Sequence, residues 1–221
     1  MSEVGQPDSG VPEDIERFRN IRWLHNHWSR SMRRSYFWYV TLEDCPDLHS
    51  LAMQCQKAVS FPYYDLTPLR DLHLTLDRIA FDDDVSAAVL PDIATSAIRA
   101  CRQMPTFDIS VGPLSGTPGA IGFSASSGGH LSSLRNILRA ATLSVYPGAP
   151  VRCDKFHAHI AIAYANSDGV SAANVVAAVD KLNATARSDV RVKVTHATLV
   201  VLEKLPRSYA WDVLSRIPLA G

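Results

Sequence analysis

A histidine and a threonine two residues apart in a strand-like stretch have the types and spacing for acid–base chemistry on a phosphate. The stretch "HLTL" begins at His73 and continues as "DRIAF". Because successive side chains of a strand point to opposite faces, we expect Thr75 and Asp77 beside His73, with the leucines on the other face. The leucine face suits a core, so the imidazole face is predicted to line solvent or a cleft.

A second stretch, "FHAHIAIAYAN", repeats this arrangement in the second half of the chain. One face is expected to carry two histidines and two small residues: His157, His159, Ala161 and Ala163. Tyr164 is expected on the opposite, apolar face. Small residues beside an imidazole leave room for a ligand, so this strand also predicts a cleft wall.

Two imidazoles can divide general-base and general-acid work near neutral pH, since each titrates close to it. The Thr75 hydroxyl can hydrogen-bond a non-bridging phosphate oxygen, and such groups can open or make a phosphodiester without a metal. The competing interpretation is a metal site with His157 and His159 as ligands. Asp77 is the one candidate for a third ligand, and no cysteine or carboxylate cluster lies nearby in the sequence to complete a site. We therefore predict neither a metal nor a cofactor.

The two stretches together resemble the 2H phosphoesterase superfamily, in particular the 2'-5' RNA ligase family proteins common in actinobacteria. That superfamily carries two His-x-Thr/Ser-x motifs on strands of two lobes. "HLTL" is a full match to the first motif, and "FHAHIAIAYAN" aligns with the second. The resemblance implies a catalytic pair of His73 and His159, with His159 as the base and His73 as the acid. It also implies that Thr75 binds the phosphate.

The second motif departs from the family pattern at two positions. Ala161 stands where the family has Ser or Thr, and Ala158 replaces its usual Pro. Loss of one hydrogen-bond donor at such a site costs on the order of 10²–10³ in rate. His157 shares the predicted face and is the candidate replacement as a phosphate donor. Two other functions therefore stay open: a module that binds a nucleotide or RNA end without turnover, and an enzyme for a specialised small metabolite.

The order of strands and helices is mixed, which predicts an α+β fold. The resemblance implies two pseudo-symmetric lobes, each an antiparallel-rich sheet with helices outside, flanking a central cleft. Residues 1–12 are predicted to be a disordered tail, and residues 13–221 a single bilobal domain. A helix is predicted over 12–30, and "VRVKVTHATLVVLEK" over 190–204 predicts one long strand.

The composition limits the classes of substrate and partner that we expect. The 221 residues carry a formal net charge of zero, which gives no electrostatic footprint for long nucleic acid. A small nucleotide or an RNA terminus needs only a local positive site and is the expected substrate. No apolar run approaches membrane-spanning length, so we expect a cytoplasmic monomer with no membrane partner. Three aromatic residues are candidates for stacking on a base: Tyr39, Phe81 and Tyr164.

Overall fold

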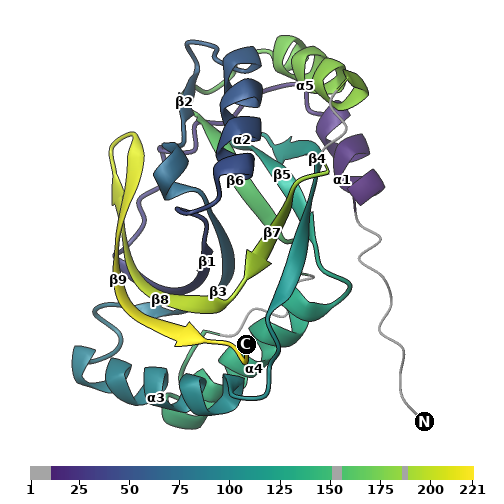
Figure 1. Ribbon diagram of the computed structural model, residues 1–221. Helices are drawn as coiled ribbons and strands as arrows, with labels where there is room; N and C mark the ends of the chain where they lie inside the picture. The colour runs from purple at the N-terminus through teal and green to yellow at the C-terminus, as the bar shows by residue number, and fades with distance from the viewer. Residues whose placement is uncertain (1–10, 151–155, 186–188) are drawn as a thin grey trace.

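The computed structural model describes residues 11–150, 156–185 and 189–221. Within them the strands form one nine-stranded antiparallel sheet in the order β7-β4-β5-β6-β3-β1-β8-β9, with β2 paired to β6 (Figure 1). The strands are β1 (Ser35–Thr41), β2 (Tyr64–Leu66), β3 (His73–Phe81), β4 (Phe107–Thr117), β5 (Ala120–Ser126), β6 (His159–Ala165), β7 (Arg191–Val194), β8 (His196–Leu205) and β9 (Ser208–Pro218). The predicted α+β class is confirmed.

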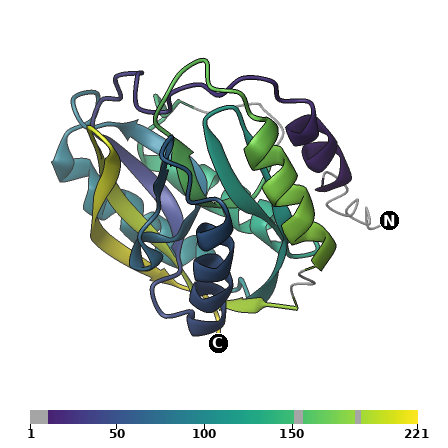
Figure 2. The same cartoon turned by 90° about the horizontal axis from the view of Figure 1, so that it is seen from above.

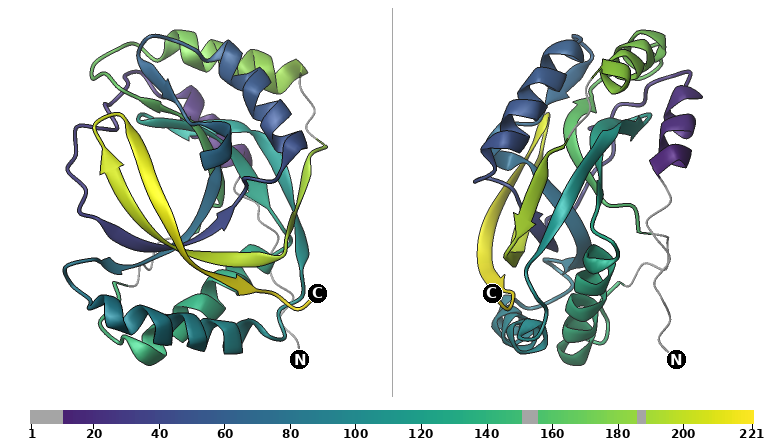
Figure 3. Two further views of the ribbon diagram at one scale, coloured as in Figure 1. Left: turned by 60° about the vertical axis from the view of Figure 1, so that its left-hand side comes forward. Right: turned by 45° about the vertical axis from the view of Figure 1, so that its right-hand side comes forward.

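Helices cover the sheet at two opposite ends of the molecule. They are α1 (Val11–Arg19), α2 (Pro46–Ala58), α3 (Leu90–Cys101), α4 (His130–Val145) and α5 (Ala173–Thr185), with 3-10 turns η1 (Leu69–Asp71) and η2 (Ala87–Val89). Helices α2 and α5 pack together over the lobe of β4, β5 and β6 (Figure 2). Helices α3 and α4 pack together beside β3 and β9, at the far end (Figure 3). The two lobes are therefore interleaved along the chain, because α2 precedes β3 and α4 follows β5.

The two lobes meet at a narrow junction between the histidine strands. β3 and β6 pair antiparallel through Leu74 and Ile160, and both side chains are fully buried. One continuous apolar core runs from one lobe to the other through these residues. The junction therefore fixes the two histidine motifs relative to each other.

The segment predicted as one long strand forms two strands on either side of Thr195, and these two strands pair with different neighbours. β7 pairs with β4 in one lobe, while β8 pairs with β1 in the other. These strands lie near opposite ends of the strand order, although one residue separates them in sequence. The sheet must therefore curl back towards itself, and Figure 3 shows this curvature.

The first helix is shorter than predicted. α1 ends at Arg19 instead of continuing to Arg30. The Asn20 side-chain amide donates to the Glu16 carbonyl at 2.9 Å, which competes with continuation of the helix. Beyond it the backbone donors bond to distant segments, as when Leu24 N donates to the Val170 carbonyl at 2.8 Å. This stretch therefore crosses the molecule without helical structure and brings His27 and Trp28 to the candidate site.

Candidate active site

The junction between β3 and β6 brings four residues of the two motifs together. In the antiparallel register of Leu74 and Ile160, Thr75 lies beside His159 and Ala161 lies beside His73. Because the paired apolar residues point into the core, these four flanking residues point to the opposite face. The sequence-predicted pair of histidines is thus brought to one site, on adjacent strands.

Each of the two histidines is oriented by a backbone carbonyl two residues before it. Nδ1 of His73 lies 2.9 Å from the Asp71 carbonyl oxygen, and Nδ1 of His159 lies 3.0 Å from the His157 carbonyl oxygen. A carbonyl only accepts, so Nδ1 donates in both rings, and in the neutral tautomer Nε2 carries the lone pair. The two motifs therefore share one mode of ring support.

The two imidazoles differ in their exposure to solvent. His73 is half-buried, and its ring stacks on the ring of Tyr39, whereas His159 is exposed. The pKa of His73 is lowered to about 4, chiefly by burial; the hydrogen bond to the Asp71 carbonyl opposes this shift, and the neighbouring His159 adds a smaller lowering effect. His73 is therefore neutral near pH 7, with a free Nε2.

A β-bulge three residues after His73 overturns one expectation about its face. Trp38 pairs with Asp77 and Tyr39 pairs with Thr75, so Leu76 is an extra residue in β3. The bulge shifts the alternation by one position. Asp77 was predicted to share the face of His73. It is instead 8% exposed and accepts from Arg139 Nε of α4 at 2.7 Å, so that it only borders the cleft.

The residue that takes the vacated position is Arg78, which lines the cleft together with Thr75. It pairs with Phe37 of β1, two positions along from the pair of Tyr39 and Thr75 and therefore on the same face. Its guanidinium lies 4.2 Å from the centre of the Phe81 ring. The bulge therefore brings a positive charge to the cleft that simple alternation had not predicted.

The second motif contains a bulge at the same place. Ile121 pairs with Ala163 and Gly122 pairs with Ala161, which leaves Ile162 as the extra residue in β6. Ala163 is fully buried as a result, and Tyr164 lines the cleft. The prediction that Ala163 shares the face of His159 and that Tyr164 faces the core is therefore wrong.

A cleft of about 570 Å³ opens over β3, β5 and β6. Its lining includes Thr75, Arg78, Ser124, Arg135, His157, His159, Ala161 and Tyr164. Helix α1 also reaches it through Asp14 and Arg17. Nδ1 of His157 lies 3.4 Å from a carboxylate oxygen of Asp14, so this imidazole stands in the cleft wall and is tied to α1.

The other sequence-predicted aromatic residues lie outside this cleft. Tyr39 is buried behind His73, and its hydroxyl hydrogen-bonds the Thr75 side chain. Burial raises the pKa of Tyr39 far above its usual range, so the hydroxyl keeps its proton. Phe81 lies at the end of β3, with the guanidinium groups of Arg33 and Arg78 at 4.1 and 4.2 Å from its ring centre.

One residue at the site, His27, comes from a segment for which the sequence predicted no function. His27 lies against Tyr164 with ring centres 4.3 Å apart, and its Nε2 is 2.6 Å from the Tyr209 hydroxyl. Burial, with a smaller effect of Lys204, lowers the pKa of His27 to about 4. The aromatic density of "WLHNHW" is the signal that could have pointed to this segment.

In the described part of the chain, no group of three His, Cys, Asp or Glu side chains is placed to hold a metal ion. No helix among the same residues combines the length and the apolar composition needed to cross a membrane.

The sequence profile of the 2'-5' RNA ligase superfamily matches residues 45–205, a span that contains both histidine strands. The chain belongs to this superfamily. A comparison with curated proteins finds no match.

Solved structures share the fold of this superfamily member at low sequence identity. TT0787 of Thermus thermophilus has a TM-score of 0.66 and 22% identity, over 85% of this chain and 98% of that chain. E. coli LigT in complex with 3'-AMP has a TM-score of 0.60 and 20% identity, over 86% and 100%. ATU0111 from Agrobacterium tumefaciens, a conserved protein of unknown function, has 0.57 and 13%, over 95% and 93%. The curled antiparallel sheet is thus a LigT-like fold.

Proposed function

We propose that this protein is a metal-independent phosphoesterase of the 2H type. It acts on a 2',3'-cyclic phosphate or a 2'-5' phosphodiester of a nucleotide or RNA end, with His73 and His159 as its acid–base pair. The observation that carries the proposal is the shared support of the two rings, each bonded through Nδ1 to a carbonyl two residues earlier. Both Nε2 atoms are left for substrate, on the face that also carries Thr75.

The lowered pKa of His73 supports it as the general base, and this reverses the roles that the family resemblance implies. A neutral His73 can take a proton from water as the water oxygen attacks phosphorus. His159 in its protonated form then gives a proton to the departing ribose oxygen. One P–O bond forms and one breaks, so a cyclic phosphate becomes a monoester.

Charge on the phosphate is met by donors already in the cleft. The Thr75 hydroxyl lies beside His159 in the strand register, and the Arg78 guanidinium lines the same cleft. The imidazole of His157 adds a donor in the wall, although Asp14 engages its Nδ1. Preplaced donors stabilise developing charge without reorganisation, which is commonly the largest single contribution to rate.

The substrate class is supported by composition and by a relative of the same fold. A net charge of zero favours a small nucleotide or an RNA end over long nucleic acid. E. coli LigT has been crystallised with 3'-AMP and with NADP+. The finer assignment, to the group common in actinobacteria, rests on the two quoted motifs.

The test is a panel of 2',3'-cyclic nucleotides and 2'-5' dinucleotides, assayed with and without EDTA. We expect turnover that survives the chelator. His73→Ala and His159→Ala should each remove most of it, and the double variant should lose little more, because the pair acts as a unit. Activity that disappears with EDTA and returns with zinc or manganese would overturn the metal-independent mechanism.

The same panel tests a second candidate, a nucleotide-binding module without turnover. Ala161 favours this candidate, because it leaves no hydroxyl beside His73 in the position that corresponds to Thr75. Tight binding of a nucleotide together with no product from any member of the panel would support the binding module instead of the enzyme.

A further inference from the structure

His73 and His159 line different hollows of the molecule. The 570 Å³ cleft is lined by His159 but, among the described residues, not by His73. His73 lines a second hollow of about 30 Å³, which has room for roughly one or two water molecules. Tyr164 is the one described residue that lines both hollows, so its side chain divides them. A phosphate in the cleft therefore meets His159 but not His73 in this conformation.

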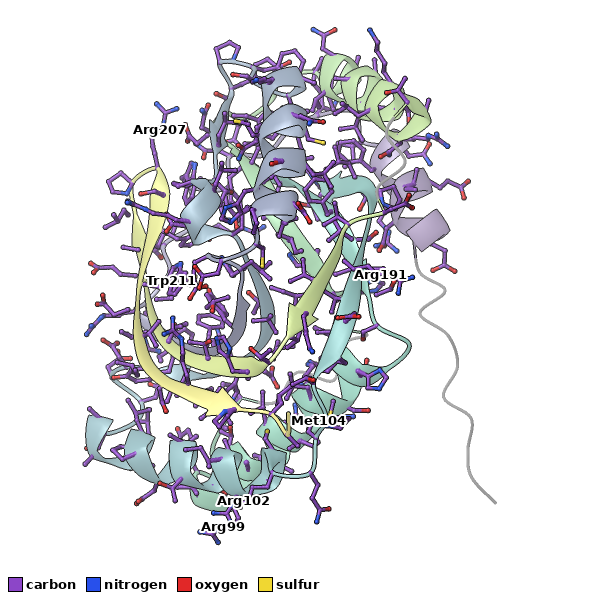
Figure 4. The ribbon with its side chains drawn as sticks, viewed as in Figure 1. Arg99, Arg102, Met104, Arg191, Arg207 and Trp211 are labelled. Atoms are coloured by element: carbon purple, nitrogen blue, oxygen red, sulfur yellow. The ribbon has the colours of Figure 1, made fainter. Side chains whose placement is uncertain are left out.

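The outer wall of the hollow beside His73 is the tip of the β8–β9 hairpin, residues 203–210, here called the hairpin tip. Three of its residues line the hollow: Arg207, Ser208 and Tyr209. β8 is paired with β1 only as far as Leu202, whose partner Ser35 is the first residue of β1. Beyond that pair no third strand of the described residues holds the hairpin, and Figure 4 shows Arg207 at its projecting end.

The hairpin tip is also separate from the main apolar core. No side chain of residues 203–210 belongs to the core that the described residues form. Segments with few buried apolar contacts open at low free-energy cost. The hairpin tip can therefore move without breaking sheet pairing to β1 or disturbing the core.

An ion pair fastens the hairpin tip to the opposite lobe. Arg207 Nε donates to the Asp65 carboxylate at 3.0 Å, and its Nη2 bonds the other carboxylate oxygen. Asp65 lies on β2, which pairs with β6. The same carboxylate accepts from Trp28 Nε1 at 2.9 Å and from Asn166 Nδ2 at 3.1 Å, so it is fixed in its own lobe. The Arg207 side chain is 64% exposed, so water competes for the pair and its energy is small.

Two further contacts join the hairpin tip to the N-terminal segment. The Tyr209 hydroxyl lies 2.6 Å from His27 Nε2, and Lys204 Nζ donates to the Trp28 carbonyl at 3.0 Å. The segment itself is bonded to the lobe of β6, because His27 N donates to the Ala165 carbonyl at 2.8 Å. Side-chain contacts, and not sheet pairing, therefore hold the hairpin tip over His73.

The same contacts keep the dividing ring of Tyr164 in place. Its centre lies 4.3 Å from that of His27, 5.3 Å from that of Trp28 and 5.5 Å from that of Tyr209. Packing this close leaves the Tyr164 ring no space to turn aside while Tyr209 stays where it is. Departure of Tyr209 with the hairpin tip would provide that space.

We infer that the hairpin tip is a movable cover for His73 and that the structure shows it closed. When it swings out, the Tyr164 ring can turn, and the small hollow joins the cleft, so that one phosphate meets both imidazoles. The link to turnover rests on the proposed function, whereas the shielding of His73 does not. Arg207 and Tyr209 lie beyond residues 45–205, so the match to the superfamily assigns them no role.

Chemical labelling of the histidines tests the cover without any substrate. Diethyl pyrocarbonate acylates neutral imidazoles near pH 7, and mass spectrometry of the peptides gives a rate for each histidine. In the wild-type protein, His73 should react roughly tenfold more slowly than the exposed His159, because it reacts only when the cover opens. The double variant Arg207→Gln/Tyr209→Phe loses one exposed ion pair and one hydrogen bond. It should raise the rate at His73 about 5- to 20-fold and leave His159 unchanged.

The matched control is Arg216→Gln. It removes an ion pair of β9 outside the hairpin tip, the 2.7 Å contact with Glu43, and should leave the rates at His73 and His159 unchanged. An equal rise at His73 in the control would mean that any loosening of β9 exposes this histidine, and it overturns the cover. The cover is also overturned if His73 reacts as fast as His159 in the wild-type protein, or no faster in the double variant.

A reversible cross-link connects the cover with turnover. In Arg207→Cys/Asp65→Cys, a short bis-methanethiosulfonate joins the hairpin tip to β2 until dithiothreitol releases it. Turnover of adenosine 2',3'-cyclic phosphate should fall roughly tenfold or more in the joined protein and return on reduction, because the open state is then inaccessible. Unchanged turnover in the joined protein overturns the cover. Absence of turnover in every form, with labelling of His73 that depends on the hairpin tip, overturns the proposed function and keeps the cover.

Discussion

The ring of Tyr39 lies stacked on the ring of His73, with centres 4.1 Å apart and planes inclined by 12°. Tyr39 is 2% exposed, so it is a fixed surface for the imidazole and not a contact for substrate. Tyr39→Leu should lower kcat about 3- to 10-fold, since an aromatic pair is worth roughly 0.5–1.5 kcal/mol beyond its buried area. Tyr39→Phe should keep most of kcat. Equal loss in both variants would mean that the hydroxyl contact to Thr75 matters more than the stack.

The lowered pKa of His73 predicts an unusual pH dependence. If His73 is the base, it must be neutral, and with a pKa of about 4 it is neutral throughout the range above pH 5. The acidic limb of kcat/KM, which reports the free protein, should therefore fall near pH 4 and not near 6.5. The Trp211 ring centre lies 6.3 Å from that of His73. Trp211→Ala should therefore move this limb to higher pH, because it opens His73 to water.

A pH profile of the wild-type protein and Trp211→Ala, with circular dichroism at each pH to follow folding, checks this. An acidic limb near pH 6.5 in the wild-type protein would mean that His73 acts as the acid. The roles would then be those implied by the family resemblance.

The sequence predicted the two histidine strands and their apolar faces, because alternation over a few residues is a local pattern. It failed where the strands are irregular. Leu76 and Ile162 are ordinary apolar residues with no mark of a bulge in their side chains, and each shifts the alternation of the residues that follow it. Asp77 and Tyr164 were assigned to the wrong faces for this reason. Only the register of the neighbouring strand reveals such an insertion.

The packing of Trp28 against Tyr164 and Tyr209 was beyond prediction for a different reason. Trp28 and Tyr209 are brought together by contacts between segments about 180 residues apart, such as the 2.6 Å contact of His27 with Tyr209. Helical propensity favoured a continuous helix through this segment, and tertiary hydrogen bonds overrode it. A local pattern carries no information on such long-range pairing.

Burial of neutral His73 also predicts a loss of stability in acid. Its folded-state pKa of about 4 lies below the unfolded value of about 6.5, so the unfolded chain takes up the proton first as the pH falls. Stability is unaffected above pH 6.5 and declines from there towards pH 4, by about 1–3 kcal/mol for this residue. Urea unfolding at several pH values should show a shallower decline in His73→Gln. The exposed His25, changed to Gln, is the control and should reproduce the wild-type slope.

The contact between Asp14 and His157 predicts that α1 contributes to activity. The His157 carbonyl holds the His159 ring, and the His157 imidazole lies 3.4 Å from the Asp14 carboxylate. Asp14→Ala should lower kcat about 2- to 5-fold, in line with the modest energy of a partly exposed ion pair. The control is Arg19→Gln, which breaks a different contact of α1, the 2.8 Å ion pair with Asp180 of α5.

A double-mutant cycle completes this test. If Asp14 acts through His157, Asp14→Ala should add little to the loss already caused by His157→Ala. Equal losses of kcat in Asp14→Ala and Arg19→Gln would mean that any loosening of α1 disturbs the site. Additive losses would mean that the two residues act separately.

The last prediction concerns the missing hydroxyl at Ala161. This residue lines the cleft beside His73, where a hydroxyl would mirror that of Thr75. Ala161→Ser should restore a donor and raise kcat about 10-fold on the best cyclic substrate, below the 10²–10³ attributed to an optimally placed donor. Ala161→Thr should raise kcat less, because the larger threonine side chain has little space at this position.

The tightness comes from the neighbouring strand. A Cβ on Gly122, the partner of Ala161, would lie 2.6 Å from the Ile160 carbonyl oxygen, so β5 approaches β6 closely here. Steady-state kinetics of both variants distinguish the gain from a new hydrogen-bond donor from the loss caused by steric crowding. Thermal melts exclude a loss of folding. A fall in kcat for the serine variant would indicate that the cleft is shaped around alanine for a particular ligand. Unchanged kcat in both variants would mean that position 161 does not meet the phosphate.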